Sequence, residues 1–231
     1  EFYVEKGEVK ARILVLSQKM AEQMYIVKKS GLIFTQGVIL EDGETIRLES
    51  SQNENLIFTF PEEMKLALPE YKDGKQEGLP VSMNAYVALC DRKECAAVLK
   101  HTDECRYILE LPDGCLDNVK DVVLKIDYIG DIGNAFIGSR LISDNYANQQ
   151  TWEIGLSDFK REIRKEKMVF YISPLKKGVK LIIDNQMAAV REIAESVEEK
   201  ILDIRLEPIY EIILKKKREF PGFVLQQKCS R

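Results

Sequence analysis

The chain has 231 residues, of which 45% are hydrophobic and 31% are charged, and its 34 basic and 38 acidic side chains nearly balance. A chain of this length buries a hydrophobic core without disulfides or metals to hold it together. The balance is typical of an ordinary globular protein and favours neither a nucleic-acid partner nor a membrane partner. No apolar run approaches the roughly 18 residues of a membrane-spanning helix, and a signal peptide is not evident. Because the sequence opens at Glu1 without an initiating Met, we interpret it as a piece of a longer polypeptide, whose targeting signal can lie elsewhere.

Residues 1–60 predict a small β-rich unit with one helix. Ser17 is a suitable N-cap for a helix that runs through Lys28 and that Gly31 terminates. Short apolar runs separated by the turn signals T-Q-G and E-D-G predict strands at 12–16, 32–34, 38–40, 45–49 and 56–60. Residues 61–80 are polar, turn-rich and bounded by Pro61 and Pro80, which favours a long loop or a domain boundary.

Residues 81–231 follow a period-two pattern that predicts an antiparallel β-sandwich of the jelly-roll type. The expected strands are 106–111, 122–128, 168–172, 180–183 and 201–214, the last of them broken at Pro208, with a turn at 112–114. One segment departs from this rhythm, because apolar residues recur at helical spacing over 185–200. The fold class is therefore mainly all-β, with one or two short helices.

The cysteines form an odd set with no C-x-x-C pair: Cys90, Cys95, Cys105, Cys115 and Cys229. The nearest array with metal-ligand character, Cys95, His101 and Cys105, lacks the paired spacing of a structural zinc site. We expect no metal and no cofactor. Reduced thiols in a cytoplasmic protein fit the set better than a secreted disulfide scaffold.

The segment 125–159 concentrates tyrosines, turn glycines, carboxylates and the only tryptophan. A sugar site combines an aromatic platform with planar side chains that donate and accept hydrogen bonds, a mixture supplied here by Asp144, Asn145, Tyr146 and Trp152. Two interpretations stay open. Trp152 faces a sugar, or it is buried between sheets while Asp144 and Asn145 cap a tight turn.

Catalytic motifs are not evident. The carboxylates Asp127, Asp131 and Glu153 in this segment are expected to serve as turn caps or solvated groups, and His101 as a loop histidine. Gly130, Gly133 and Gly138 do not follow G-x-G-x-x-G and are expected to serve turns. The sequence also contains no G-x-S-x-G elbow. We therefore assign no catalytic residue.

Three stretches carry a family resemblance: I-D-Y-I-G-D from Ile126, G-S-R-L-I-S-D-N-Y from Gly138 and W-E-I-G-L from Trp152. Together they resemble the C-terminal β-sandwich region of large bacterial glycoside hydrolases of family 35, the β-galactosidase type. Weaker similarity extends over 171–178 and 201–214. Two stretches have no counterpart in that pattern, namely the helical segment 185–200 and the cysteine-bearing stretch 90–115.

The resemblance implies a galactose-binding-like jelly-roll fold that flanks a catalytic (β/α)8 barrel, where the family's two catalytic glutamates reside. This chain has neither the pattern nor the room for such a barrel. Three hypotheses follow. The chain is a non-catalytic accessory region supporting the barrel of a β-galactosidase, with activity residing in the parent protein; it is an independent galactose-binding module; or it is a self-contained glycosidase.

Overall fold

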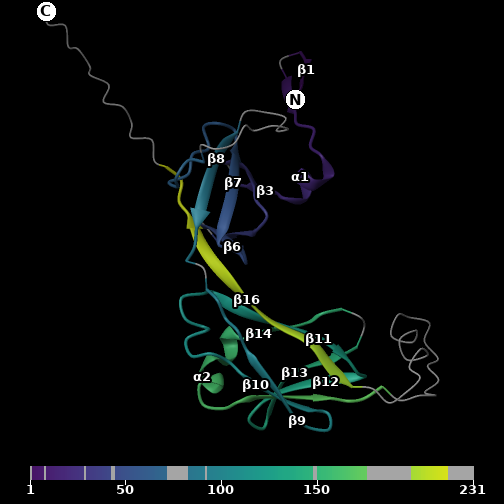
Figure 1. The fold of residues 1–231 in the computed structure, drawn as a ribbon. Helices are drawn as coiled ribbons and strands as arrows, with labels where there is room; N and C mark the ends of the chain where they lie inside the picture. The colour runs from purple at the N-terminus through teal and green to yellow at the C-terminus, as the bar shows by residue number, and fades with distance from the viewer. Residues whose placement is uncertain are drawn as a thin grey trace, which may run out of the picture. The chain divides into compact units, whose positions relative to one another are not determined.

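The protein is mainly β, as the sequence predicts, with only short helices among the residues described. The structure, a computed structural model, describes residues 2–7, 9–28, 30–42, 45–71, 83–91, 93–147, 150–175 and 199–217. The chain divides into two compact units, residues 1–90 with 212–231 and residues 91–211 (Figure 1). Within the described ranges no helix is long and apolar enough to cross a bilayer.

Unit 1 is built from two short hairpin systems and a sheet. Its elements are β1 (Phe2–Lys6), β2 (Val9–Ile13), α1 (Gln18–Glu22), β3 (Met24–Val27), β4 (Gly31–Phe34), β5 (Val38–Asp42), β6 (Thr45–Ser50), β7 (Glu54–Phe60) and β8 (Asn84–Leu89). Strands β3, β4, β7 and β8 form an antiparallel sheet in that order, which we call sheet III. Its inner face, with Ile33, Ile57 and Tyr86, packs against Leu48 of β6 and the buried Leu66.

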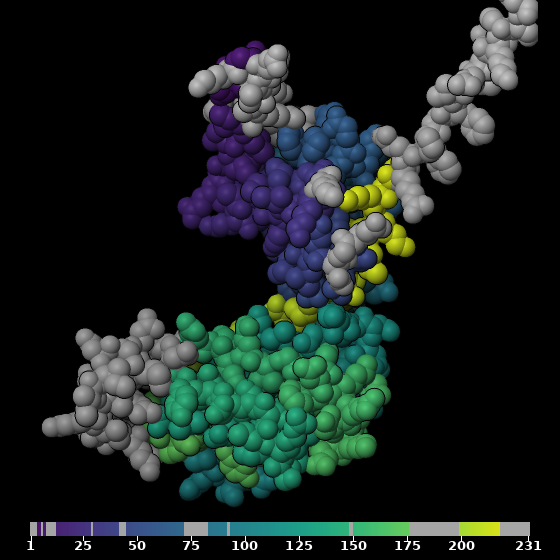
Figure 2. Space-filling view, turned by 180° about the vertical axis from the view of Figure 1, so that it is seen from behind, coloured from purple at the N-terminus to yellow at the C-terminus, as the bar shows by residue number. Residues whose placement is uncertain are grey.

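Unit 2 is a sandwich of two antiparallel sheets. Its elements are β9 (Val98–Asp103), β10 (Arg106–Glu110), β11 (Asp121–Ile129), β12 (Ile132–Ile137), β13 (Arg140–Tyr146), β14 (Trp152–Gly155), the 3-10 helix Ser157–Phe159, α2 (Lys160–Ile163), β15 (Met168–Ile172) and β16 (Lys200–Leu214). Sheet I has the order β13-β12-β15-β10-β9, and the strands of sheet II that belong to this unit have the order β14-β11-β16. Their inner faces share one core, in which Leu109 and Phe170 of sheet I meet Leu124 and Ile126 of sheet II. In the space-filling view the teal and green residues of this unit form one closely packed body (Figure 2).

The predicted first helix is shorter in the structure, and a strand replaces its second half, because sheet pairing overrides the local sequence pattern. The helix capped by Ser17, whose Oγ accepts a hydrogen bond from Met20 N–H at 3.3 Å, ends at Glu22 instead of Lys28. The following residues form β3 and pair with β4, since aromatic and β-branched side chains such as Tyr25 and Val27 fit a half-buried strand. Gly31 begins β4 at φ +138, where an added Cβ would lie 2.1 Å from Phe60 O.

The C-terminal strand also differs. The sequence predicts a break at Pro208, whereas β16 continues through it and Pro208 lies opposite Val122 in the β11 register. A proline fits within a strand only where its missing N–H is not needed by the ladder. The final residues of β16, from Ile212, belong to unit 1, where the strand adjoins β6.

The N-terminal strand and the boundary segment are also placed differently. Strand β2 ends at Ile13, and Leu14 and Leu16 of the strand expected at 12–16 pack instead beside Phe34. Residues 61–71 of the expected loop belong to unit 1, where Met64 is buried, so the units divide after Cys90. Residues 72–80, the strand expected at 180–183 and residues 185–198 of the helix expected over 185–200 lie outside the described residues. The last residue of that expected helix, Lys200, instead begins β16.

Candidate functional site

The four residues expected to bind sugar do not gather at one place. Asp144, Asn145 and Tyr146 lie on β13 at the edge of sheet I, whereas Trp152 begins β14 at the edge of sheet II. Successive side chains of a strand point to opposite faces. Asp144 and Tyr146 therefore share the outer face of sheet I, and Asn145 faces inward.

Trp152 is a core residue, which answers the question that the sequence left open. Its side chain is 4% exposed and makes edge-to-face contacts with Tyr128 and Phe170 at 6.0 and 5.9 Å between ring centroids. Its Nε1–H donates to Ser143 Oγ at 3.0 Å, so the polar end of the indole is satisfied. Gly133 of β12 gives it room, because a Cβ there would lie 2.7 Å from the indole Cζ3. Trp152 thus offers no platform to a ligand.

Asn145 is engaged by a neighbouring tyrosine. The Tyr128 hydroxyl donates to the Asn145 carbonyl oxygen at 2.9 Å and accepts from Asn145 Nδ2 at 3.1 Å. Burial is the main reason that the pKa of Tyr128 is raised. This pair fixes β13 over the core and engages one donor of the Asn145 side-chain amide.

The end of the W-E-I-G-L stretch is anchored by a residue that the sequence did not single out. Asp121 Oδ1 accepts hydrogen bonds from the backbone N–H groups of Val122, Leu156 and Ser157 at 2.7, 3.1 and 2.8 Å. Gly155 is required beside it, because a Cβ there would lie 2.8 Å from Asp121 Oδ2. The conspicuous motif is therefore a structural junction between β14 and the following helical turn.

Two other carboxylates of the segment, Asp127 and Glu153, are paired with cations. Asp127 accepts from Arg205 at 2.9 Å and from Thr151 Oγ1 at 2.7 Å, and Glu153 lies 3.4 Å from Lys125 Nζ. These pairs lie at the surface and stabilise the fold only modestly. None of them forms the facing pair of carboxylates that glycoside hydrolysis requires.

A row of polar and aromatic side chains crosses the outer face of sheet I. Asp144 lies opposite Asn134, Asn134 opposite Tyr171, and Tyr171 opposite Arg106. Directly paired residues of an antiparallel sheet point to the same side. We call these four residues the sheet I row. It contains one of the predicted residues, Asp144, and three that local sequence pattern does not connect with it, since they lie on three other strands.

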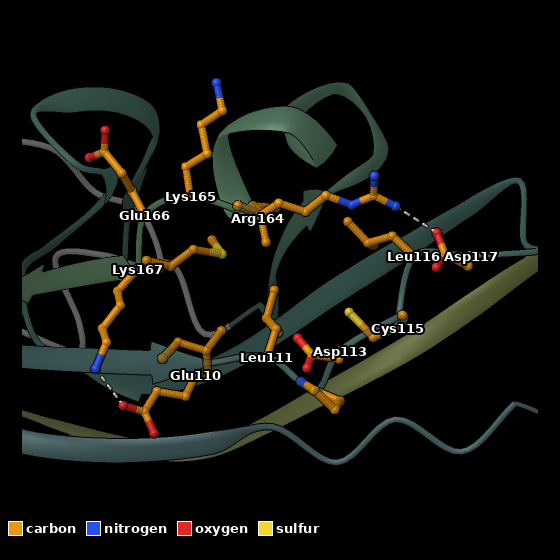
Figure 3. Close-up of a pocket in the computed structure, with 15 residues that line it drawn as sticks. Glu110, Leu111, Asp113, Cys115, Leu116, Asp117, Arg164, Lys165, Glu166 and Lys167 are labelled. Atoms are coloured by element: carbon orange, nitrogen blue, oxygen red, sulfur yellow. Dashed lines mark hydrogen bonds and ion pairs between the residues drawn. The ribbon is translucent and has the colours of Figure 1, made fainter.

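The cavity of unit 2 shown in Figure 3 has a volume of about 270 Å³. Leu109, Leu111, Leu116 and Met168 contribute its apolar walls, and Cys115 projects into the space between them. The turn predicted at Pro112–Gly114 forms one side of it, with Cys115 N–H donating to Pro112 O at 3.2 Å.

Ion pairs occupy both ends of this cavity. Arg164 and Lys160 lie 3.0 and 2.8 Å from Asp117 Oδ1, and Lys167 and Lys100 lie 2.6 and 2.7 Å from the Glu110 carboxylate oxygens. Hydrogen bonds from Lys100 and Lys167 lower the pKa of Glu110 to about 2, and the bond from Lys160 lowers that of Asp117. Both carboxylates are thus held ionised and cannot serve as general acids near neutral pH. Lys165 and Glu166 point away from these pairs (Figure 3).

His101 lies in β9 rather than in a loop. Its ring stacks on Tyr107 with 4.5 Å between centroids, and its Nε2 lies 3.7 Å from Glu199 Oε1. Tyr107 donates to Glu199 Oε2 at 2.9 Å, and burial together with this bond raises the pKa of Tyr107 to about 12. The arrangement ties the start of β16 to the β9–β10 hairpin.

Cys95, Cys105 and Cys115 are free thiols, and burial raises the pKa of all three; Cys90 is half-buried. Over the described ranges no group of three or more His, Cys, Asp or Glu side chains is arranged to hold a metal ion. Cys229 lies outside those ranges. Thiols of raised pKa are poor nucleophiles at neutral pH.

Comparison with protein-family models, with curated proteins and with solved structures found no match for this chain.

Proposed function

We propose that this chain is a non-catalytic accessory region of a β-galactosidase-type glycoside hydrolase, in which unit 1 packs against the catalytic (β/α)8 barrel of the parent chain. The parent enzyme is suggested by the sequence resemblance alone. The observation that carries the packing role is the outer face of sheet III, which is apolar although that sheet already buries its inner face in a core.

The register of sheet III defines this outer face. Ile26 lies opposite Leu32, and Leu32 opposite Phe60, while Leu56 lies opposite Val87. An antiparallel sheet with one solvated face normally alternates apolar and polar residues. Sheet III instead reads apolar on both sides, which is the pattern of a sheet covered on both sides.

The cover that the described residues provide is partial. Leu14, Leu16 and Met20 pack over Phe34 and Met83 in the middle of the face. At its borders Ile26, Leu56 and Leu89 remain 73%, 38% and 72% exposed. Exposed apolar surface of this kind marks an interaction site. The catalytic barrel is the occupant that we assign to it.

The chemistry of unit 2 supports a non-catalytic role. Asp127 and Glu153 are paired with Arg205 and Lys125, and the pKa of Glu110 is lowered to about 2, the opposite of what a general acid needs. The free thiols fit the cytoplasm, where we place the protein.

The first test is the sequence encoded directly before Glu1. A (β/α)8 barrel with paired glutamates there supports the accessory role, whereas an initiating Met at that point contradicts it. Purified chain should not hydrolyse p-nitrophenyl β-galactoside. Turnover that stays with the protein through successive purification steps would favour a self-contained glycosidase instead.

The second test examines the packing surface itself. Hydrogen exchange should slow in β3 and β8 when the chain is part of the longer protein, relative to the isolated chain. Strand β9 of unit 2 serves as the internal control and should exchange equally in both. If β3 and β8 exchange at the same rate in the isolated chain and in the longer protein, the barrel does not cover sheet III.

A further inference from the structure

We propose that a pocket in unit 1, at one end of sheet III, receives a tyrosine side chain of the barrel that covers this sheet. The ring of that tyrosine packs against Leu56 and Phe58, and its hydroxyl bonds to Thr35. The inference rests on the accessory role proposed above, because it assigns one anchoring contact within that packing surface. It concerns residues that the sequence did not single out.

The pocket lies beyond the end of β4, beside the first residues of β7. The pairing of β4 with β7 runs from Leu32 opposite Phe60 to Phe34 opposite Phe58, whereas β7 begins at Glu54. The first residues of β7 therefore extend past the end of β4. The space there has a volume of about 240 Å³. Because an aromatic ring with one small substituent fits such a space, the pocket has the size for a single side chain.

Phe34, Leu56 and Phe58 form the apolar wall of the pocket. Phe34 and Phe58 are directly paired, so they lie on the same face of the sheet, and both belong to the cluster around Met83. Leu56, two residues before Phe58 on β7, shares that face and is 38% exposed. Leu56 thus belongs both to this wall and to the apolar surface that we assign to the barrel, and the pocket is continuous with that surface.

Thr35 contributes a polar group that the chain itself leaves unsatisfied. The residue lines the pocket and is 4% exposed, and its Oγ1 is buried without a hydrogen-bond partner in the described part of the chain. Its backbone N–H donates to Gln23 O at 3.0 Å, which fixes the position of the residue after β4. A buried hydroxyl without a partner destabilises a fold, and a bound group that hydrogen-bonds to it removes that cost.

Asn55 contributes a second polar group to the pocket. It is also 4% exposed, and its Nδ2 donates to Gln52 O at 2.8 Å, which orients the amide. Within the described ranges, its Oδ1 accepts no hydrogen bond. A pocket with an apolar wall and a few fixed polar groups is the usual form of a site for one specific group.

The lining indicates which side chain the pocket receives. Its described residues include no Lys, Arg or His, and the carboxylate of Glu54 is solvent-exposed, so neither an anionic nor a cationic group gains a buried partner. The side chains that most often anchor an interface in a pocket are Trp, Tyr and Arg. A phenol hydroxyl both donates and accepts, as the hydroxyl of Thr35 and the amides of the lining require, whereas an indole N–H only donates. Tyrosine is therefore the anchor that we assign.

The experiment is an NMR titration of the isotopically labelled full chain with four side-chain analogues. These are p-cresol for tyrosine, toluene for phenylalanine, 3-methylindole for tryptophan and ethylguanidinium for arginine. We expect p-cresol to shift the amide signals of Thr35, Asn55 and Leu56 and to bind more tightly than the other three. Thr35→Val keeps the shape of the side chain and removes the hydroxyl. It should reduce the affinity for p-cresol about fivefold and leave that for toluene unchanged.

Thr45→Val is the matched control, because Thr45 is exposed on β6 and does not line the pocket. It should leave p-cresol binding unchanged, and circular dichroism should show both variants folded. Absence of p-cresol shifts at the pocket would overturn the proposal, as would an affinity for p-cresol that Thr35→Val leaves intact. Tighter binding of 3-methylindole or ethylguanidinium would also overturn it, because the pocket would then suit Trp or Arg.

The same titration of the longer protein tests where the tyrosine comes from. With the pocket filled by the barrel, p-cresol should no longer shift the signals of Thr35 and Asn55, and binding that persists there would overturn the assignment. Failure of the pocket leaves the accessory role standing, since that role is tested by hydrogen exchange in β3 and β8 and by the sequence before Glu1. An initiating Met directly before Glu1 would contradict the accessory role and, with it, the barrel as the source of the tyrosine.

Discussion

Sheets I and III each bury one face in the core of their own unit, yet their outer faces differ in chemistry. Sheet III presents Ile26, Leu56 and Leu89 to solvent, whereas the outer face of sheet I carries a polar and aromatic row that includes Asp144 and Tyr171. Beside that row lies an apolar one: Leu141, Phe136, Val169 and Ile108. Since the two inner faces are similarly apolar, fold stability does not explain the contrast. An apolar outer face favours permanent cover by protein.

Replacing Trp152 by Ala should have the largest effect and should be confined to unit 2. The indole is 4% exposed, contacts two aromatic rings and donates to Ser143, so its removal leaves a cavity and an unpaired hydroxyl. We expect a loss of about 3 to 5 kcal/mol in the free energy of unfolding, measured by urea denaturation.

Tyr146→Ala is the control for Trp152→Ala, and it should change stability by less than about 0.5 kcal/mol because the side chain is 56% exposed. A stability loss of similar size in both variants would contradict the assignment of Trp152 to the core and of Tyr146 to the outer face.

The corresponding change in unit 1 is Gly31→Ala. At φ +138, with Phe60 O 2.1 Å from the position of the new Cβ, the substitution strains the start of β4 and forces the β4–β7 pairing apart. The expected cost exceeds about 1 kcal/mol and should lower the thermal midpoint. Gly7→Ala is the control for steric contact, since it also has positive φ but no atom within 4 Å. Equal losses for the two would attribute the effect to backbone strain alone.

The sequence predicted the strands more accurately than the candidate site, and the reasons are physical. Periodicity located strands such as Met168–Ile172 because each side chain responds to the burial of its own position. The helix expected through Lys28 failed because the pairing of β3 with β4 is a contact that local pattern does not contain.

The candidate site was harder to predict than the strands. The sequence cluster joined Asp144 to Trp152 because they are near in sequence, but they lie in different sheets. The sheet I row assembles Asp144, Asn134, Tyr171 and Arg106 through the order β13-β12-β15-β10, which depends on long-range pairing. The alternation along β13 alone could have indicated that Asp144 and Tyr146 share a face and that Asn145 does not.

A charged residue introduced on the apolar outer face of sheet III should reduce dye binding without changing the free energy of unfolding. Leu89→Asp is expected to change the free energy of unfolding by less than about 0.5 kcal/mol, because the side chain is 72% exposed. It should reduce the fluorescence of the apolar dye ANS bound to the folded chain. Leu202→Asp, at a similarly exposed position on sheet II, should reduce it less. Equal reductions would mean that sheet III has no special apolar character.

The smallest expected effect concerns the ion pairs at the cavity of unit 2 and their contribution to the stability of the fold at acid pH. Lys100 and Lys167 lower the pKa of Glu110 from 4.5 to about 2 in the folded protein, so the unfolded chain binds this proton more readily. The stabilisation is complete above pH 4.5 and is lost as the pH falls towards about 2. Glu110→Gln should therefore lower stability slightly at pH 7 and flatten its decline through that window, measured as urea midpoints against pH. Glu54→Gln is the matched control, because Glu54 is exposed and its side chain has no ion pair or hydrogen bond within the part of the chain that the structure describes. A flattening of the same size in both variants would show that the lysines do not hold Glu110 in its ionised form.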